Sequence, residues 1–207
     1  NFIGVFMSGI VAQNTLDNTG LIKSPAGGGA WNFISKQTAS SSATIDFTSG
    51  IDSTYREYFF TFKNIHPEND EVGFDFQGNA AGGADYNETM TTTHFSAYHN
   101  EAGSEQALTY QTTRDQAQGT AFQKLTNNIG NGNDECTSGY LHLFNPSSTV
   151  FVTHFIAHFV DYHYQDYILD IYTTGYFNTT SAIDEIQFKM SSGAIDAGDI
   201  CLYGITT

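Results

Sequence analysis

Basic residues are scarce in this sequence. The chain has 207 residues, with 7 Lys and Arg against 22 Asp and Glu, which gives a formal net charge of -15. A protein that binds duplex nucleic acid needs clustered Lys and Arg to displace counterions from the phosphates. Binding to an anionic membrane surface makes the same demand. Seven scattered basic residues cannot form such a patch, so the sequence predicts no nucleic-acid partner and no membrane-surface partner.

Cysteines and long apolar runs are scarce as well. Cys136 and Cys201 are the only cysteines, and the sequence leaves open whether they form a disulfide or two free thiols. The longest apolar stretch, residues 2–12, is about half as long as the roughly 20 residues that cross a bilayer. No basic segment precedes it, as a signal peptide would require. We therefore expect no membrane insertion.

Aromatic residues, in contrast, are plentiful, with 17 Phe and 12 Tyr. From Thr44 onward, apolar and polar residues alternate with the period of two that is typical of strands. Clusters of Asn, Asp, Gly and Ser separate these runs as turns. Roughly ten short strands with regular turns predict an all-β fold over residues 31–207, an antiparallel β-sandwich of jelly-roll type.

Apolar residues of the alternating runs are expected to form the core between two sheets. This predicted core consists of Phe60, Phe62, Phe74, Phe76, Leu141, Leu143, Phe151, Phe155, Ile186, Phe188, Ile200 and Leu202. Helix signals are weak. Residues 114–125 contain good helix formers, but the central Gly119 costs about 1 kcal/mol relative to Ala, so either a short helix or a loop is expected there.

The first 30 residues differ in character and predict an extended N-terminal arm. Its apolar positions are Phe2, Ile3, Val5, Phe6, Met7, Ile10 and Val11, and the predicted hinge is Gly27, Gly28 and Gly29. Such an arm either folds back as the first strand of its own sheet or pairs with the edge strand of a neighbouring copy. The second alternative produces a trimer, another closed ring, or a fibre of identical subunits.

Catalytic signatures are missing. The sequence has no G-x-S-x-G elbow, no phosphate-binding G-x-x-x-x-G-K-[ST] loop and no H-E-x-x-H motif. No spacing selects the facing pair of carboxylates that a glycosidase needs. We therefore expect a protein that is not an enzyme and has no organic cofactor.

Calcium is the metal that the sequence favours. Oxygen-rich loops occur at residues 68–71, at residues 131–135, and at Asp196 with Asp199. The candidate ligands of the second loop are Asn131, Asn133, Asp134 and Glu135. Together with backbone carbonyls, such loops can supply the roughly six to eight oxygen ligands of Ca²⁺. None of them matches the D-x-[DN]-x-[DN]-G pattern of the EF-hand.

Tyr and His are concentrated in residues 154–172. Exposed rings beside carboxylates can form a sugar-binding surface, whereas rings packed on a sheet belong to the core. Tyr162, His163 and Tyr164 fall where a strand is predicted to end, so they are the candidate glycan-binding residues.

Most of the chain from about Gln37 onward resembles virion proteins encoded by marine bacteriophages, which are often labelled tail fibre. The residues that carry the resemblance are 41–58 (SSATIDFTSGIDSTYREY), 138–155 (SGYLHLFNPSSTVFVTHF) and 178–205. The resemblance implies a non-enzymatic β module displayed on the virion surface as a tail-fibre or tail subunit, or as a capsid decoration. Its partners would be copies of itself and other virion proteins. Three alternatives are a carbohydrate-binding module for a host surface glycan, a subunit of a non-viral extracellular filament built by strand exchange, and a hydrolase on the same scaffold.

Overall fold

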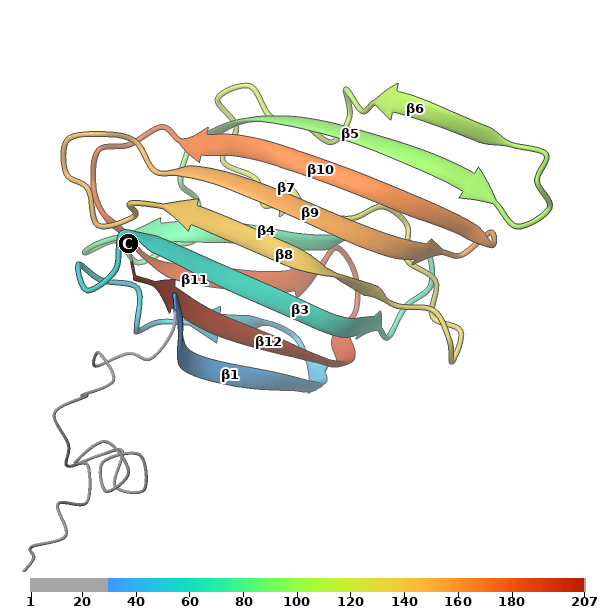
Figure 1. Cartoon of the computed structure of the whole chain (residues 1–207), viewed down its shortest axis with the longest axis horizontal. Coiled ribbons are helices and arrows are strands. Elements are labelled where there is room, and N and C mark those ends of the chain that lie inside the picture. The colour runs from blue at the N-terminus through green and yellow to red at the C-terminus, as the bar shows by residue number, and fades with distance from the viewer. Residues whose placement is uncertain (1–29, 207) are drawn as a thin grey trace, which may run out of the picture.

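The computed structural model describes residues 30–206, and these form two antiparallel β-sheets packed face to face (Figure 1). Sheet A has eight strands in the order β1-β12-β3-β8-β9-β10-β5-β6, and sheet B has four in the order β2-β11-β4-β7. The strands of sheet A are β1 (Trp31–Ser42), β3 (Glu57–Pro67), β5 (Met90–Asn100), β6 (Gln106–Tyr110), β8 (Thr137–Phe144), β9 (His154–His163), β10 (Tyr167–Phe177) and β12 (Ile195–Ile205). Those of sheet B are β2 (Ile45–Phe47), β4 (Phe74–Ala80), β7 (Gln123–Lys124) and β11 (Ile183–Met190).

The predicted all-β antiparallel sandwich is confirmed. The finer prediction of a jelly roll is not established, because a jelly roll divides eight strands between two sheets, whereas here eight strands face four. The predicted helix at residues 114–125 is wrong and its loop alternative is right. This segment forms turns and the two-residue strand β7. Within residues 30–206 no helix is long and apolar enough to cross a membrane.

The core lies between the sheets and consists largely of phenylalanines. Phe188 of β11 lies at its centre, with its ring centroid 5.3 Å from Phe60 and 5.0 Å from Phe62 of the opposite sheet. Phe74 stacks on the same ring at 5.7 Å. Eleven of the twelve predicted core residues are buried: Phe60, Phe62, Phe74, Phe76, Leu141, Leu143, Phe155, Ile186, Phe188, Ile200 and Leu202.

The twelfth predicted core residue, Phe151, is wrongly assigned, because its side chain is 71% exposed. The hydroxyl oxygen of Ser148 accepts hydrogen bonds from the N–H groups of Val150 and Phe151, at 3.2 and 2.9 Å. Such a side-chain cap competes with strand pairing. The turn after β8 therefore runs on, and β9 begins only at His154.

The predicted arm residues Phe2, Ile3, Val5, Phe6, Met7, Ile10 and Val11, and the predicted hinge Gly27, Gly28 and Gly29, lie outside the described residues. The arm therefore stays a prediction. The described chain enters sheet A at β1, which is an edge strand.

Candidate functional site

The outer side of sheet A carries a continuous surface of aromatic rings, which we call the aromatic face. Its members are Trp31, Phe33, Phe59, Phe95, Tyr140, His142, Phe144, His158, Tyr172 and Tyr203. The outer side of sheet A is turned toward the viewer in Figure 1. Alternation along each strand places these rings outward, since their neighbours Tyr58, Phe60, Leu141 and Leu143 are buried on the inner side.

Strand register brings the rings of the aromatic face into contact across the sheet. Tyr140 pairs with His158, and His158 pairs with Tyr172. The centroids of His158 and Tyr172 are 4.1 Å apart with nearly parallel rings, and Phe95 stacks on Tyr172 at 5.2 Å. Toward β1, Phe59 stacks on Tyr140 at 5.0 Å and contacts Trp31 at 4.4 Å. The rings therefore form one connected surface that reaches from β1 to β5.

No part of residues 30–206 covers the aromatic face. Phe33 is 62% exposed, and large apolar side chains around the rings are exposed as well: Leu108, Tyr110, Ile156, Val160 and Ile168. An antiparallel sheet with one solvated side normally carries polar residues there. A monomer rarely leaves so large an apolar patch bare, so this face has the properties of an interaction surface.

Carboxylates on the aromatic face are paired with basic groups. The carboxylate of Asp199 lies 2.9 Å from Lys36 Nζ and 3.0 Å from Lys63 Nζ. The hydrogen bond from Lys36, followed by those from Thr38 and Lys63, holds the pKa of Asp199 well below its usual range. His142 Nε2 lies 2.9 Å from the Glu57 carboxylate, and His158 pairs with Asp170. The charge of Asp199 is therefore compensated by two lysines on this face.

An apolar groove extends the aromatic face at one end. It has a volume of about 510 Å³ and is lined by Phe144, His154, Ile156, Tyr176 and neighbouring threonines of β5 and β10. His154 and Tyr176 are register partners on β9 and β10. The groove thus gives the flat sheet a depression into which an apolar side chain of a partner can fit.

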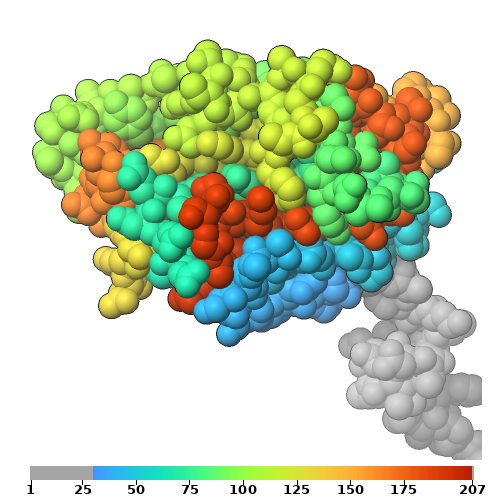
Figure 2. Space-filling view, turned by 180° about the vertical axis from the view of Figure 1, so that it is seen from behind, coloured from blue at the N-terminus to red at the C-terminus, as the bar shows by residue number. Residues whose placement is uncertain are grey.

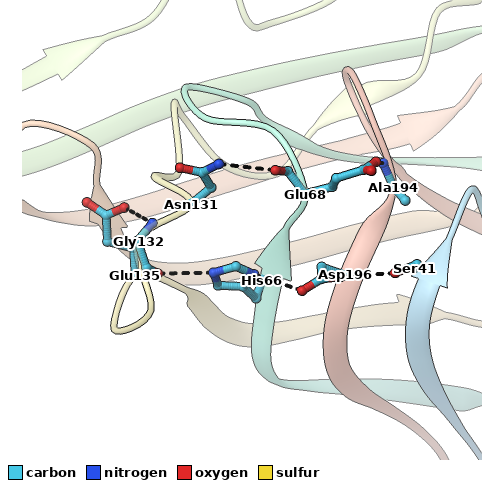
Figure 3. Close-up of polar contacts among 8 residues, drawn as sticks. All are labelled: Ser41, His66, Glu68, Asn131, Gly132, Glu135, Ala194 and Asp196. Atoms are coloured by element: carbon cyan, nitrogen blue, oxygen red, sulfur yellow. Dashed lines mark hydrogen bonds and ion pairs between the residues drawn. The ribbon is translucent and has the colours of Figure 1, made fainter.

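Two of the loops predicted to bind calcium, residues 68–71 and 131–135, converge near Asp196 (Figure 3). Asp196 and Asp199 lie within β12 and not in a loop, and Asp199 pairs instead with Lys36 and Lys63. Both β3 and β12 are bulged here, and the bulges turn His66 and Asp196 toward each other. Gly198 has a φ of 124°, and a Cβ atom on it would lie 2.7 Å from the Asn64 carbonyl oxygen. Glycine is therefore required at this bulge.

Hydrogen bonds among the converged loops use many of their oxygen atoms. Asn131 Nδ2 donates to the Glu68 carbonyl at 3.1 Å, and the backbone N–H of Asn131 donates to Asp70 Oδ1 at 3.3 Å. His66 Nε2 donates to the Gly132 carbonyl at 3.0 Å, and His66 Nδ1 lies 3.7 Å from Asp196 Oδ2. The Glu135 carboxylate accepts the N–H of Gly132.

A polar hollow of about 480 Å³ lies beside these loops, lined by Asn64, His66, Asn133, Asp134, Glu135 and Asp196. Among residues 30–206, no group of three or more His, Cys, Asp or Glu side chains is placed to hold a metal ion. The hydrogen bonds explain the convergence of the loops without a cation, and the calcium site of Asn131, Asn133, Asp134 and Glu135 stays a prediction.

The predicted glycan-binding residues do not form one platform. Tyr162 is half-exposed on the outer side of β9, and its hydroxyl donates to Glu101 at 3.2 Å. His163 is buried, so its predicted exposure is wrong, because β9 continues through this residue and alternation turns the ring inward. Tyr164 lies in the following turn, where its ring contacts that of His163 at 4.6 Å. Cys136 and Cys201 are free thiols, so the disulfide alternative is not realised.

Sequence reasoning missed the aromatic face. The available signal was a run of apolar or aromatic residues at consecutive positions, as at Tyr58, Phe59 and Phe60. Such a strand has two apolar sides. The side that does not face the core must then be exposed or covered by a partner. Comparison with known proteins adds no relative: no family model, no curated protein and no solved structure matches this chain.

Proposed function

We propose that this chain is a non-enzymatic structural subunit displayed on a virion surface, as a tail-fibre or tail subunit or as a capsid decoration, and that it assembles by packing its aromatic face against a second copy. The observation that carries the assembly is the aromatic face itself, an apolar surface across sheet A with no cover within residues 30–206. The virion placement is supported by the resemblance of residues 41–58, 138–155 and 178–205 to marine phage proteins.

The size of the aromatic face suits a stable contact between copies. Eight strands about 4.8 Å apart span roughly 35 Å, and strands of about ten residues extend roughly 30 Å. The face therefore offers roughly 1,000 Å² per copy, which exceeds the roughly 800 Å² per partner of a standard protein interface.

For two copies that associate, charge favours contact through the aromatic face over contact elsewhere. The chain carries a net charge of -15, so two copies repel each other over most of their surface. Repulsion is smallest where a carboxylate is already paired with a cation, as Asp199 is with Lys36 and Lys63. Two copies that meet through the aromatic face bury apolar area and keep their unpaired carboxylates in water.

Introducing negative charge on the aromatic face is expected to dissociate the assembly. We predict that the full chain sediments as a dimer or larger species at about 50 μM, and that the double variant Phe33→Glu and Ile156→Glu sediments as a monomer, because two buried unpaired charges outweigh the contact energy. Analytical ultracentrifugation measures this result. Both side chains are exposed, so the unfolding temperature should change little.

Phe151→Glu is the matched control for this experiment. Phe151 is 71% exposed, like the variant positions, but it lies in the loop between β8 and β9 outside the aromatic face. It should leave the sedimentation of the full chain unchanged. A wild-type chain that is monomeric at this concentration, or a double variant that still assembles, would contradict the proposal. The virion placement is tested separately, by asking whether antibodies against this chain label purified phage particles.

Deleting the predicted arm should weaken assembly but leave the fold intact. Within residues 30–206 the buried core is supplied by residues from Ala39 onward, so a chain that begins at Ala30 keeps these core side chains. We expect its circular dichroism and cooperative unfolding to match those of the full chain. Its oligomers should dissociate at a higher protein concentration than those of the full chain. If the shortened chain assembles normally, strand exchange by residues 2–12 is excluded and the aromatic face suffices. If it fails to fold, the arm is a strand of its own domain.

A further inference from the structure

A further polar pocket, separate from the groove and the hollow described above, lies on the inner side of sheet A beneath the segment between β6 and β8. Sheet B packs against β9 and β10 through Phe74 and Phe76. At the pocket the segment between β6 and β8 lies against sheet A instead, where Asn127 N–H donates to Asp161 of β9 and Gln111 donates to Ser96 of β5. Figure 2 shows this segment in yellow-green across the back of the molecule. This pocket, which we call the Arg114 pocket, has a volume of about 180 Å³. Residues central to it are Tyr98, Gln111, Arg114, Asn127, His163 and Tyr167.

One wall of the Arg114 pocket is made of stacked rings. Tyr98 and Tyr167 are 5.7 Å apart with an angle of 23° between their planes. His163 stacks on the other side of Tyr167 at 5.3 Å and 19°. All three residues lie on the inner side of their strands, at or near the strand ends. Because the rings stack on one another, they hold each other in place, and the wall presents their edges and the parts of their faces that stacking leaves uncovered.

The polar lining of the pocket has hydrogen-bonding capacity to spare. Asn127 is 3% exposed, and its Oδ1 is buried without a hydrogen-bond partner among the described residues. Its backbone N–H donates to the buried Asp161 carboxylate at 3.0 Å, which fixes the residue in position. A buried carbonyl oxygen without a donor is rare in folded proteins. The buried ring of His94, whose Nε2 also has no partner among residues 30–206, lies next to this side chain. Asn127 Oδ1 can therefore accept a hydrogen bond from His94 or from a ligand.

Donors face the same pocket. His163 Nδ1 accepts the N–H of Gln165 at 3.2 Å, so the ring hydrogen is on Nε2, and burial lowers the pKa of His163, which keeps the ring neutral. One terminal nitrogen of Arg114 donates to Asn128 Oδ1 at 3.4 Å. A guanidinium has five N–H donors, so Arg114 retains donors for a ligand.

We propose that the Arg114 pocket binds one neutral sugar residue, with its hydroxyl groups on Asn127, Arg114 and His163 and its apolar ring face against Tyr98 and Tyr167. A hydroxyl group both donates and accepts, so it matches a lining that offers an unpaired acceptor beside several donors. An aromatic wall with a few fixed polar groups is typical of small-molecule sites.

Charge argues for a neutral ligand over an anion. The guanidinium of Arg114 is the cation of this pocket, and the nearby Asp161 and Asp75 carboxylates already interact with it. The net charge of -15 disfavours the approach of an anion from solution. This site is separate from the aromatic face, and its test does not depend on assembly.

The proposal is tested on the full chain by ligand-observed and ¹H–¹⁵N NMR titration with glucose, galactose, mannose, fucose and N-acetylglucosamine, and with inorganic phosphate as the anionic probe. We expect at least one sugar to bind with millimolar affinity and to shift the amide signals of Gln111, Arg114 and Asn127. Arg114→Ala should weaken this binding by tenfold or more. Arg56→Ala removes an exposed arginine that immediately precedes β3 and does not line the pocket, so it should leave sugar binding unchanged.

Several outcomes would overturn the proposal. The first is that no sugar binds at about 50 mM, a concentration that would detect a millimolar site. The second is that the signal shifts are confined to the aromatic face. The others are equal affinity for phosphate and unchanged sugar affinity in Arg114→Ala. If Arg114→Ala does not fold, Arg114→Lys keeps the positive charge but loses the fork of donors. It should still weaken sugar binding, and the shift map of the wild-type chain decides the location independently of either variant.

Discussion

Replacing Phe188 with Ala should lower the free energy of unfolding by about 3–5 kcal/mol, one of the two largest effects of a single substitution that we expect. The ring of Phe188 is fully buried and contacts aromatic rings of both sheets, including Phe47, Phe60 and Phe74. Its removal leaves a cavity that these rigid rings cannot fill without leaving their rotamers. Urea denaturation should show a lower midpoint with an unchanged slope.

Phe151→Ala is the control, since it deletes the same atoms from an exposed position and should change stability by less than about 0.5 kcal/mol. A typical domain is stable by about 5–15 kcal/mol, so Phe188→Ala can unfold a marginal one. Phe188→Leu then provides a milder change that should still destabilise by about 1–2 kcal/mol. Equal losses for Phe188→Ala and Phe151→Ala would show that the assigned core is wrong.

Alternation in the sequence was sufficient to predict the sandwich and most of its core, because the strands with buried Phe, Leu and Ile have a clear period of two. It did not predict β5, and the structure shows why. The inward positions of β5 include Thr92, His94 and Ser96, which are buried polar residues. Their hydroxyl and ring atoms bond to Gln123, Thr173 and Gln111. A strand whose inner side is polar has no hydrophobic alternation to detect.

The absence of a helix at residues 114–125 has a similar explanation. Gln116 N–H donates to Thr92 Oγ1 at 2.8 Å, and Gly119 exchanges backbone hydrogen bonds with Met90. The buried Gln123 side chain donates to the Arg114 carbonyl at 2.8 Å. These contacts with β5 and within the loop override a local helix propensity that Gly119 already weakens.

The candidate sites were harder to predict than the fold, because they depend on partners that are distant in sequence. Alternation cannot tell which side of a strand faces inward when both sides are apolar, so the run around Phe59 indicates a second apolar side without showing which side is exposed. Likewise, His163 was selected from its place at a strand end. Its stacking partners Tyr98 and Tyr167 and the opposing Arg114 are brought to it only by the register of β9, β10 and β5 and by the segment between β6 and β8.

Asp75→Asn should stabilise the protein at pH 8, which is the second large effect that we expect. Asp75 lies on β4 between Lys124 and Lys189 in register, yet it is buried and its Oδ1 has no hydrogen-bond partner among residues 30–206. Burial raises the pKa of Asp75 to about 7, and the nearby cations Lys124, Lys189 and Arg114 offset only part of that effect. An ionised Asp75 is therefore held in the fold at a cost that a neutral amide of the same shape avoids.

The sign of the pH dependence follows from this raised pKa. In the unfolded chain an Asp has a pKa of about 3.9, so between about pH 4 and pH 7 the folded state holds a proton that the unfolded state has lost. Stability therefore falls as the pH rises through this window. Asn cannot ionise, so the gain from Asp75→Asn should be roughly 3–4 kcal/mol at pH 8 and about 1 kcal/mol at pH 4.5. Urea denaturation of both chains at the two pH values measures the difference.

Asp85→Asn is the matched control, because it removes the same charge from an exposed position and should change stability by less than about 0.5 kcal/mol at either pH. Asp161 is a less suitable position than Asp75 for the stabilising Asp→Asn substitution. Burial also raises its pKa to about 7, but its carboxylate accepts hydrogen bonds from Thr137 and from the N–H of Asn127, and an amide would disturb both. If Asp75→Asn destabilises the chain at pH 8, or if its gain does not shrink on acidification, the buried carboxylate must have a hydrogen-bonding or ionic partner in solution that compensates for its burial.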